Sequence, residues 1–374
     1  MKKVSKTKML AFVVMIAGIL SATSCQKEFL ITAMPDDGSH GTVNGGGVYK
    51  EGSVIEIWAV PATGYRFERW DDGYTDNPRT ITVTGNATYI AIFSGGVFTD
   101  AFSVSATRTV YFSPGNLQWS ATNGGSSPTY HPVAGGYGSA PGTWRFAPNQ
   151  WDIIGIENRY IDSAYTGWID LFGWGTSGWN SGNTYYHPWD SNDDSIGLTY
   201  GPPGEYNLTG SYANADWGVY NPISNGGNIA NQWRTLTNEE WQYVFSTRTT
   251  TSGIRYAKAK VNNINGVILL PDDWSSSTYS LSNTNNSGAS FSSNTISASQ
   301  WTTLESAGAV FLPAAGFRHG ASVGNVGSLG CYWSASYDGS DGAYYVIFDD
   351  SGLGANYGIG RSYGRSVRLV CPAE

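Results

Sequence analysis

Charged side chains are scarce in this chain. They make up 13% of its 374 residues, and no basic cluster occurs beyond the first eight positions. The absence of a basic surface excludes the electrostatic footprint of a nucleic-acid-binding protein, so no nucleic-acid partner is expected. Low charge does not indicate disorder here, because aromatic residues reach 14% of the composition, whereas disordered chains are poor in them.

Strong helix formers are also few, while Gly alone contributes 48 residues. This composition favours short strands joined by long loops. Only two helices are predicted. Thr237 and Glu240 have the spacing of a capping box, and a second helix runs from about Ser297 to Ser306 with Trp301 and Leu304 facing inward. Buried strands are expected at Val267–Leu270 and Val310–Pro313.

The apolar run Met9–Leu20 is too short to span a membrane comfortably as a permanent helix. It follows four lysines and precedes Ala22-Thr23-Ser24-Cys25, which resembles a bacterial lipobox. The resemblance implies a signal peptide at 1–24, lipidation of Cys25 and a tether at 25–28. Gln26-Lys27-Glu28 is similar to the starts of Bacteroidota lipoproteins, which implies an outer-membrane lipoprotein at the cell surface. An ordinary signal peptide with a chance cysteine is the alternative.

The stretch 29–94 has the pattern of a small all-β module. Strand-like runs occur at Phe29–Met34, Val54–Val60, Tyr65–Trp70, Arg79–Thr84 and Ala87–Phe93, with turn residues between them. From Val54 to Ala59 the residues alternate between two faces, which fits a sheet with one buried face.

Short motifs in this module resemble the internalin-type B-repeat family. They are Gly41-Thr42-Val43, Gly52-Ser53-Val54, Ala62–Trp70 and Thr82–Tyr89. Family members are extracellular spacer or adhesion modules, so this one is expected to hold the following domain off the membrane.

From residue 97 to residue 374 the residue composition and patterning differ from those of the first module. Residues 155–232 form long loops rich in Gly, Asn, Tyr and Trp, and such loops are usually functional or tied to a core. Their tryptophans are expected to anchor them: Trp168, Trp174, Trp179, Trp189 and Trp217.

Gln232–Val244 resembles a segment of the formylglycine-generating-enzyme branch of the C-type-lectin fold. Val310–Arg318, Tyr332–Ser336 and Gly364–Val370 look like the closing segments of the Fibrobacter major paralogous domain family. These resemblances imply an α+β fold: a C-type-lectin-like (formylglycine-generating-enzyme-like) ligand-binding domain at 97–374. A fold of this kind hosts catalysis, sugar binding and protein binding, so it does not specify the function.

The segment Arg318–Arg365 also resembles the variable proteins of diversity-generating retroelements. In that family, adenine-directed mutagenesis of Asn-type codons cannot produce Lys, Glu, Gln or Met, and all four are absent from this segment. Chance absence is the alternative to diversification.

Alternation in the last strands predicts a binding surface. Tyr344, Val346 and Phe348 should face the core, while the opposite face and adjacent loops should be exposed and free to vary. The predicted ligand-binding residues are His319, Ala321, Asp338, Asp341, Tyr345, Ile347, Asp349, Asp350, Asn356, Tyr357, Ile359 and Tyr363.

Catalysis is not expected. Cys331 and Cys371 lack the spacing of the redox pair in the enzyme branch, and both a disulfide and two free thiols remain open for them. The four histidines are scattered along the chain. Asp190–Asp194 offers oxygen ligands but lacks the Gly and distal Glu of an EF-hand loop, so no metal or other cofactor is expected.

The sequence therefore predicts a surface lipoprotein that binds an extracellular ligand. A protein ligand bound by a diversified domain is favoured. A glycan-binding or adhesive lipoprotein without diversification, and a structural protein of the cell envelope, are the alternatives.

Overall fold

A computed structural model of the chain describes residues 27–38, 40–61, 65–95, 100–120, 142–155, 167–179, 206–319, 322–339 and 342–373. The described part is mostly β, with few helices. The lipobox cysteine Cys25 and the acidic stretch Asp190–Asp194 lie outside the described residues.

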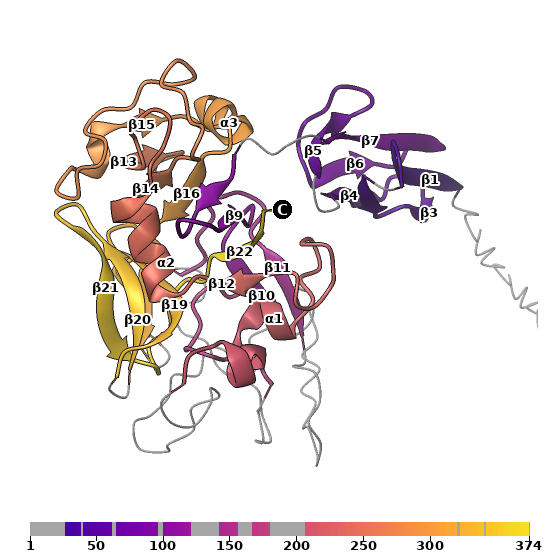
Figure 1. Cartoon of the computed structure of the whole chain (residues 1–374). Coiled ribbons are helices and arrows are strands. Elements are labelled where there is room, and N and C mark those ends of the chain that lie inside the picture. The colour runs from indigo at the N-terminus through magenta and orange to yellow at the C-terminus, as the bar shows by residue number, and fades with distance from the viewer. Residues whose placement is uncertain are drawn as a thin grey trace, which may run out of the picture.

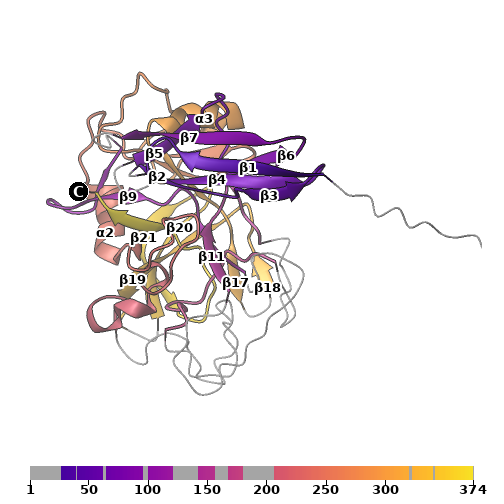
Figure 2. The same ribbon diagram turned by 90° about the vertical axis from the view of Figure 1, so that its right-hand side faces the viewer.

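The first module consists of two sheets that pack face to face (Figure 2). One has the strand order β3-β1-β7-β5 and the other β2-β4-β6. The bounds are β1 Glu28–Pro35, β2 Gly41–Asn44, β3 Gly47–Lys50, β4 Val54–Pro61, β5 Tyr65–Trp70, β6 Arg79–Thr82 and β7 Ala87–Gly95.

Inward residues of both sheets form one core. Ile31 and Ala91 come from the first sheet and Ile57 from the second, and Trp70 is fully buried between them. The predicted alternation in β4 is confirmed, because Ile57 and Ala59 are buried while Val54 and Glu56 are exposed. The five predicted strands of this module are present, and the structure adds β2 and β3. Each of these two short strands begins with a glycine, and Gly45 and Gly46 lie between them, which weakened the strand signal in the sequence.

The second domain begins with β8 Phe102–Ser103 and contains five sheets among its described residues. Figure 1 shows the sheet of β13 to β16 beside α3, and the sheet of β19, β20 and β21 beside α2. The strands are β9 Thr109–Phe112, β10 Leu117–Ser120, β11 Thr143–Phe146, β12 Arg234–Thr235, β13 Tyr256–Val261, β14 Ile264–Leu269, β15 Thr295–Ile296, β16 Val310–Pro313, β17 Phe317–His319, β18 Ser322–Gly324, β19 Gly330–Tyr337, β20 Gly342–Phe348, β21 Leu353–Gly360 and β22 Leu369–Pro372.

Both predicted helices are present. α2 (Asn238–Gln242) starts with the capping box of Thr237 and Glu240 and continues as a π-helical turn, Tyr243–Thr247. α3 (Ala298–Ser306) begins after Ser297, which forms a second capping box. The remaining helical segments are η1 Gly210–Ala215, α1 Trp217–Tyr220 and η3 Phe291–Ser293.

A buried arginine joins several of these elements. Arg368 has no exposed surface, and its guanidinium donates to Gln150 Oε1, to Asn116 Oδ1 at 3.3 Å and to the Phe311 carbonyl at 3.1 Å. Gln150 in turn donates to Glu305 on α3 at 2.8 Å. Each donor contact offsets part of the cost of burying the charge, so the arginine ties the end of the chain to α3 and β16.

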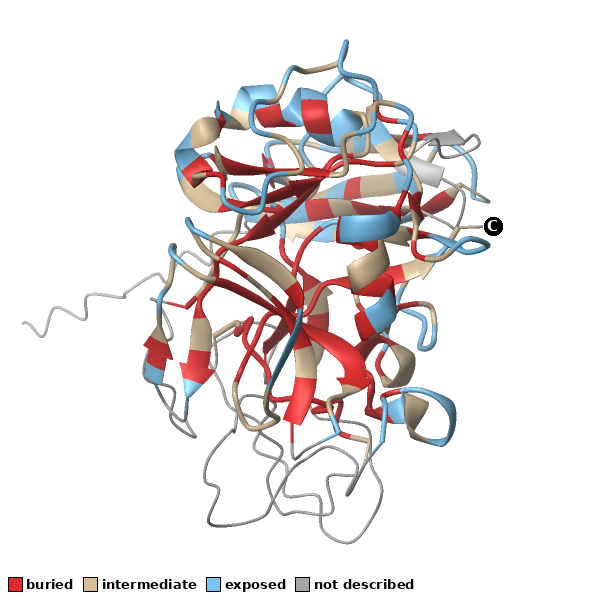
Figure 3. Cartoon of the chain, turned by 60° about the vertical axis from the view of Figure 1, so that its left-hand side comes forward, coloured by how far each residue is buried: buried red, intermediate tan, exposed pale blue. Residues whose placement is uncertain are grey.

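The sheet of β19, β20 and β21 lies between two apolar clusters. On one side, Tyr332, Val346 and Phe348 pack in a cluster that includes Trp241 of α2. On the other side, Trp333 and its neighbours pack in a second cluster. Figure 3 shows these strands as largely buried, with exposed residues along part of the sheet's margin. Because both faces have partners, the sheet provides a rigid base for the loops at its edge.

Candidate functional site: an aromatic row with a buried arginine

Three aromatic residues lie side by side across the sheet on the face opposite α2. Trp333 of β19 pairs with Tyr345 of β20, and Tyr345 pairs with Tyr357 of β21. Their ring centroids are 6.2 Å and 6.3 Å apart in tilted or edge-on arrangements. We call these three residues the aromatic row and this side of the sheet the row face. Cross-strand neighbours of this kind contact each other directly because facing Cβ atoms are close together.

Arg365 covers the buried end of the aromatic row. Its guanidinium carbon lies 3.8 Å from the centroid of the Tyr345 ring and 5.2 Å from that of Trp333. The residue is 3% exposed. Burial lowers the pKa of Arg365, although this group remains charged at neutral pH because its ordinary pKa is so high. The rings stabilise the cation through their π faces.

The row face reaches the surface through Tyr363, His319 and Tyr357. The ring of Tyr363 lies 5.9 Å from the Arg365 guanidinium, and it stacks on the exposed His319 ring with centroids 4.9 Å apart. Tyr357, at the other end of the row, is 53% exposed. The structure therefore brings together six of the predicted ligand-binding residues on or beside one face: His319, Tyr345, Ile347, Tyr357, Ile359 and Tyr363.

Tyr345 was expected on an open surface, and the structure corrects this. The alternation is right for Val346 and Phe348, which face the other way into the core, whereas Tyr344, also predicted to face the core, is only half-buried. Tyr345 is nevertheless only 7% exposed, because Arg365 covers its ring. Ile347 and Ile359 are half-buried against the same cluster. A strand pattern identifies the two faces, but it cannot tell whether a distant residue covers the second one.

Asp349 and Asp350 hold the turn between β20 and β21. The Asp349 carboxylate accepts hydrogen bonds from the backbone amides of Ser351 and Gly352, at 2.7 and 2.8 Å. The Asp350 carboxylate accepts from Ser290 Oγ and from the Phe291 amide, both at 2.8 Å. These bonds lower the pKa of Asp350. The two aspartates serve the fold rather than the row face.

The other predicted residues divide between the sheet and the part of the chain that is not described. Asn356 accepts a hydrogen bond from Asn238 of α2 at 2.9 Å, so it contacts the helix side of the sheet. Asp338 accepts from the Gly342 amide at 3.2 Å at the β19–β20 turn. Ala321 and Asp341 lie outside the described residues.

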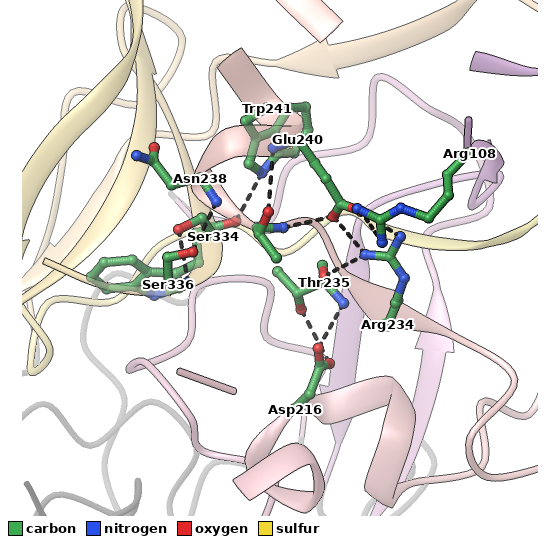
Figure 4. Close-up of polar contacts among 11 residues, drawn as sticks. Arg108, Asp216, Arg234, Thr235, Asn238, Glu240, Trp241, Ser334 and Ser336 are labelled. Atoms are coloured by element: carbon green, nitrogen blue, oxygen red, sulfur yellow. Dashed lines mark hydrogen bonds and ion pairs between the residues drawn. The ribbon is translucent and has the colours of Figure 1, made fainter. Parts of the chain in front are cut away.

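The segment that resembles the formylglycine-generating-enzyme branch forms a network of polar contacts around the start of α2 (Figure 4). We call this network the polar brace. Glu240 pairs with Arg234 through two contacts of 2.6 and 2.8 Å, and with Arg108 at 3.2 Å. Trp241 donates its indole N–H to the Trp333 carbonyl at 3.3 Å. The Asn238 amide donates to Ser336 Oγ at 3.0 Å. The brace therefore connects α2 to β19, which carries the first ring of the aromatic row.

A buried carboxylate completes this brace. Asp216 accepts hydrogen bonds from the Thr235 amide at 2.7 Å, the Thr235 hydroxyl at 3.1 Å and the Gly218 amide at 3.2 Å. Burial outweighs these bonds and raises the pKa of Asp216 to about 6. Its oxygens bind backbone and hydroxyl donors of its own fold, so they act as a helix cap and strand support.

The two described cysteines are free thiols, so the disulfide left open by the sequence is not formed. Burial raises the pKa of Cys331 and of Cys371 to about 11. Both are therefore protonated at neutral pH, and nucleophilic or metal-binding chemistry requires the thiolate.

Trp174 and Trp217 are buried as expected, and they line the cluster beneath the row face. Trp168 and Trp179 are half-buried, while Trp189 lies outside the described residues. Within the described ranges, no group of three or more His, Cys, Asp or Glu side chains is placed to hold a metal ion. No helix in the described part is long and apolar enough to cross a membrane.

Sequence reasoning missed Arg365. It belongs to Gly364–Val370, which resembles a closing segment of the second domain and contributed no predicted ligand-binding residue. Only its position in space relates it to the aromatic row, because its neighbours Trp333 and Tyr345 are on other strands. The sequence offered no local signal for this role, because Arg318 and Arg361 occur in the same aromatic-rich segment as Arg365.

Comparison with known families identifies the first module. The family of divergent InlB B-repeat domains matches residues 30–96. This confirms the B-repeat module that the sequence motifs predicted. Searches of the curated proteins and of the solved structures each found no match.

Proposed function

We propose that this protein is a surface lipoprotein whose second domain binds an external protein through the row face. The first module separates this domain from the membrane, and lipid at Cys25 retains the protein there. The observation that carries the proposal is the surface formed by Tyr357, Tyr363 and His319 on a sheet with two packed faces. Tyrosine supplies contact area at a low entropy cost, and a rigid base reduces the ordering that binding requires.

A C-type-lectin-like fold is the proposed architecture of residues 97–374. Supporting this are the resemblance of Gln232–Val244 and the structural use of its residues, since Thr237 and Glu240 cap α2 and Trp241 contacts β19. Superposition of an experimental structure on formylglycine-generating enzymes tests the assignment. A different strand order in the sheets around α2 would contradict it.

Diversification of Arg318–Arg365 is the second part of the proposal. The exposed residues of this segment include His319, Tyr357 and Asn356, while Cys331 and Val346 are buried. Substitutions at the exposed positions would change the surface and leave the core intact. The test is the flanking DNA, where a near-copy of this coding segment should lie beside a reverse-transcriptase gene and differ at adenines. The absence of such a copy ends this part of the proposal.

The glycan-binding alternative requires exposed aromatic rings, and tryptophan would be the usual choice for stacking on sugars. No tryptophan in the described ranges is exposed, whereas Tyr74, Tyr206 and Tyr357 are. The protein-binding reading is therefore favoured over the glycan-binding one.

The experiment that tests binding uses the mature chain on protein and glycan arrays. Retention of array proteins should decrease at least severalfold with Tyr357→Ala, because an exposed aromatic residue at the centre of an interface contributes strongly. Tyr206→Ala is the matched control, since Tyr206 is also an exposed tyrosine, 38% accessible, and is not part of the row face. Sugar-dependent retention that survives Tyr357→Ala would favour the glycan-binding alternative.

For the cell-envelope alternative, the informative change is deletion of residues 97–374 in the producing cell. Loss of envelope integrity with unchanged attachment would favour a structural role over ligand binding.

A further inference from the structure

Arg365 differs from the buried arginines Arg248 and Arg368 in its polar contacts. Arg248 is 1% exposed and donates to Asp272 at 2.9 Å and to the Leu270 carbonyl at 2.6 Å. Arg368 donates to side-chain and backbone oxygens, as described above. Arg365 is also almost fully buried, but among the described residues no oxygen accepts from its guanidinium and no carboxylate forms an ion pair with it; its Nε atom, like that of Arg368, has no acceptor.

The groups that face Arg365 do not replace an anion. Its guanidinium contacts the rings of Trp333, Tyr345 and Tyr363 and the thiol of Cys331. The thiol is uncharged at neutral pH because burial raises the pKa of Cys331 to about 11. The aromatic rings contact the guanidinium, but they provide no oxygen acceptor for its N–H groups. A buried cation without a counter-charge is costly, and a carboxylate that binds it recovers much of that cost.

We propose that Arg365 binds an acidic side chain of the protein ligand, an aspartate or glutamate carboxylate that enters the row face beside Tyr357 and Tyr363. This inference rests on the proposed function, because it specifies the chemistry of the same face. The guanidinium offers a planar pair of N–H donors that matches a carboxylate. Tyr363 is half-buried and stacks on the exposed His319, so a shift of these two rings opens the guanidinium to the ligand.

The arrangement also explains how one site can serve many ligands. Arg365 is buried and forms an isolated backbone bridge with Phe172, so it supplies a charged contact anchored in the core, while the exposed Tyr357 and His319 supply the contacts that differ between ligands. Ligands of different shape would then share one requirement, which is an acidic residue placed opposite Arg365.

The test selects peptides from a random displayed library on the mature chain, and then measures the affinity of the selected peptides. An acidic residue should be essential, so changing that residue in the peptide from Asp to Asn weakens binding by roughly tenfold. Arg365→Gln should weaken the acidic peptide by a similar factor and have little further effect on the amide peptide, as expected for two groups in contact. Arg365→Lys should lose part of the affinity, because it keeps the charge and loses the paired donors.

Two features make the result decisive. The change in the peptide leaves the protein untouched, so it tests the proposal even if an Arg365 variant folds poorly. Arg69→Gln, which removes an arginine of the first module whose side chain is 43% exposed, is the matched control and should leave the affinity unchanged.

The outcomes separate the two proposals. Peptides that depend on Tyr357 but bind equally well with Asp or Asn overturn the role of Arg365 and leave the row face as the binding site. Peptides that are insensitive to both Tyr357→Ala and Arg365→Gln, or a selection that recovers no peptide, overturn both.

Discussion

At the residue scale, the second domain carries several charges that are fully buried. Arg368 is held by oxygen acceptors from Gln150, Asn116 and Phe311, and Asp216 by donors from Thr235 and Gly218. Asp170 is different, because one of its oxygens accepts from the Ile154 amide at 2.8 Å and the other has no hydrogen-bond partner. Arg318 lies near enough to favour its charged form, but burial has the larger effect.

Asp170 makes the stability of the protein depend on pH. Burial raises the pKa of Asp170 from 3.8 to about 6, so the folded state binds a proton that the unfolded state has already released. The unfolding free energy should therefore fall as the pH rises from about 4 to about 6, and this group should account for about 3 kcal/mol of the decrease. Asp216 contributes in the same direction.

The measurement is urea unfolding of the wild-type protein and of Asp170→Asn at pH values across this window. The amide stays uncharged and can still accept from Ile154, so the variant should show a smaller decrease with pH. Asp273→Asn, at an exposed position, should retain the wild-type decrease. An Asp170→Asn protein with an unchanged pH dependence would show that Asp170 does not titrate in this range.

At the element scale, α2 positions the sheet of the row face through its first turn. The Thr237 hydroxyl accepts from the Glu240 amide at 3.2 Å, and the Glu240 carboxylate accepts from the Thr237 amide at 2.9 Å. The same carboxylate binds Arg234 and Arg108, and Trp241 follows directly with its bond to β19. A substitution at this helix start should therefore disturb the contacts between α2 and β19.

Thr237→Ala should lower the unfolding free energy by about 1 kcal/mol, the usual cost of losing a helix cap. Thr303→Ala, at an exposed position within α3, is the matched control and should cost less. Chemical denaturation measures both. Equal losses in the two variants would show that the capping box contributes no more than an exposed threonine.

The β20–β21 turn gives an element-scale test that separates fold from binding. Asp350→Ala removes the acceptor of Ser290 and Phe291, and it should reduce stability by about 1 kcal/mol. Affinity for the selected peptides should not change, because Asp350 braces η3 rather than the row face. A clear loss of affinity at unchanged stability would show that Asp350 contributes to ligand binding.

At the scale of the whole molecule, the chain combines a divergent B-repeat module with a mostly β second domain. Leu30 and Val48 are cross-strand partners on an exposed face of the first module, so this module has no apolar cover there among the described residues. This fits a spacer that exposes most of its surface.

Membrane attachment is the prediction that belongs to this scale. Cys25→Ser should move the protein from the membrane fraction to the soluble fraction, because lipid is the proposed link to the bilayer. Cell fractionation with labelled fatty acid measures it, and Cys371→Ser is the matched control outside the lipobox. Persistent membrane association of an unlabelled Cys25→Ser protein would contradict the lipoprotein proposal.

Features that depend on neighbouring residues could be predicted before the fold was known. The capping box at Thr237, the start of a helix at about Ser297, the alternation of β4 and the two faces of β20 each follow from local spacing, because backbone hydrogen bonds and side-chain direction are set within a few residues. The B-repeat module was recognisable for the same reason, since its motifs recur in fixed order along one short segment.

Which of these faces are free depends on contacts between segments that are distant in the sequence. Tyr345 and Tyr357 belong to the same face, but Arg365 covers the first and leaves the second exposed. The sequence predicts Asp350 as a ligand-binding residue, whereas in the structure its carboxylate accepts a hydrogen bond from the Phe291 amide of η3. Burial depends on residues that are distant in the sequence and meet only after folding. The pattern of a strand therefore gives its two sides, while the rest of the chain determines which side remains open to a ligand.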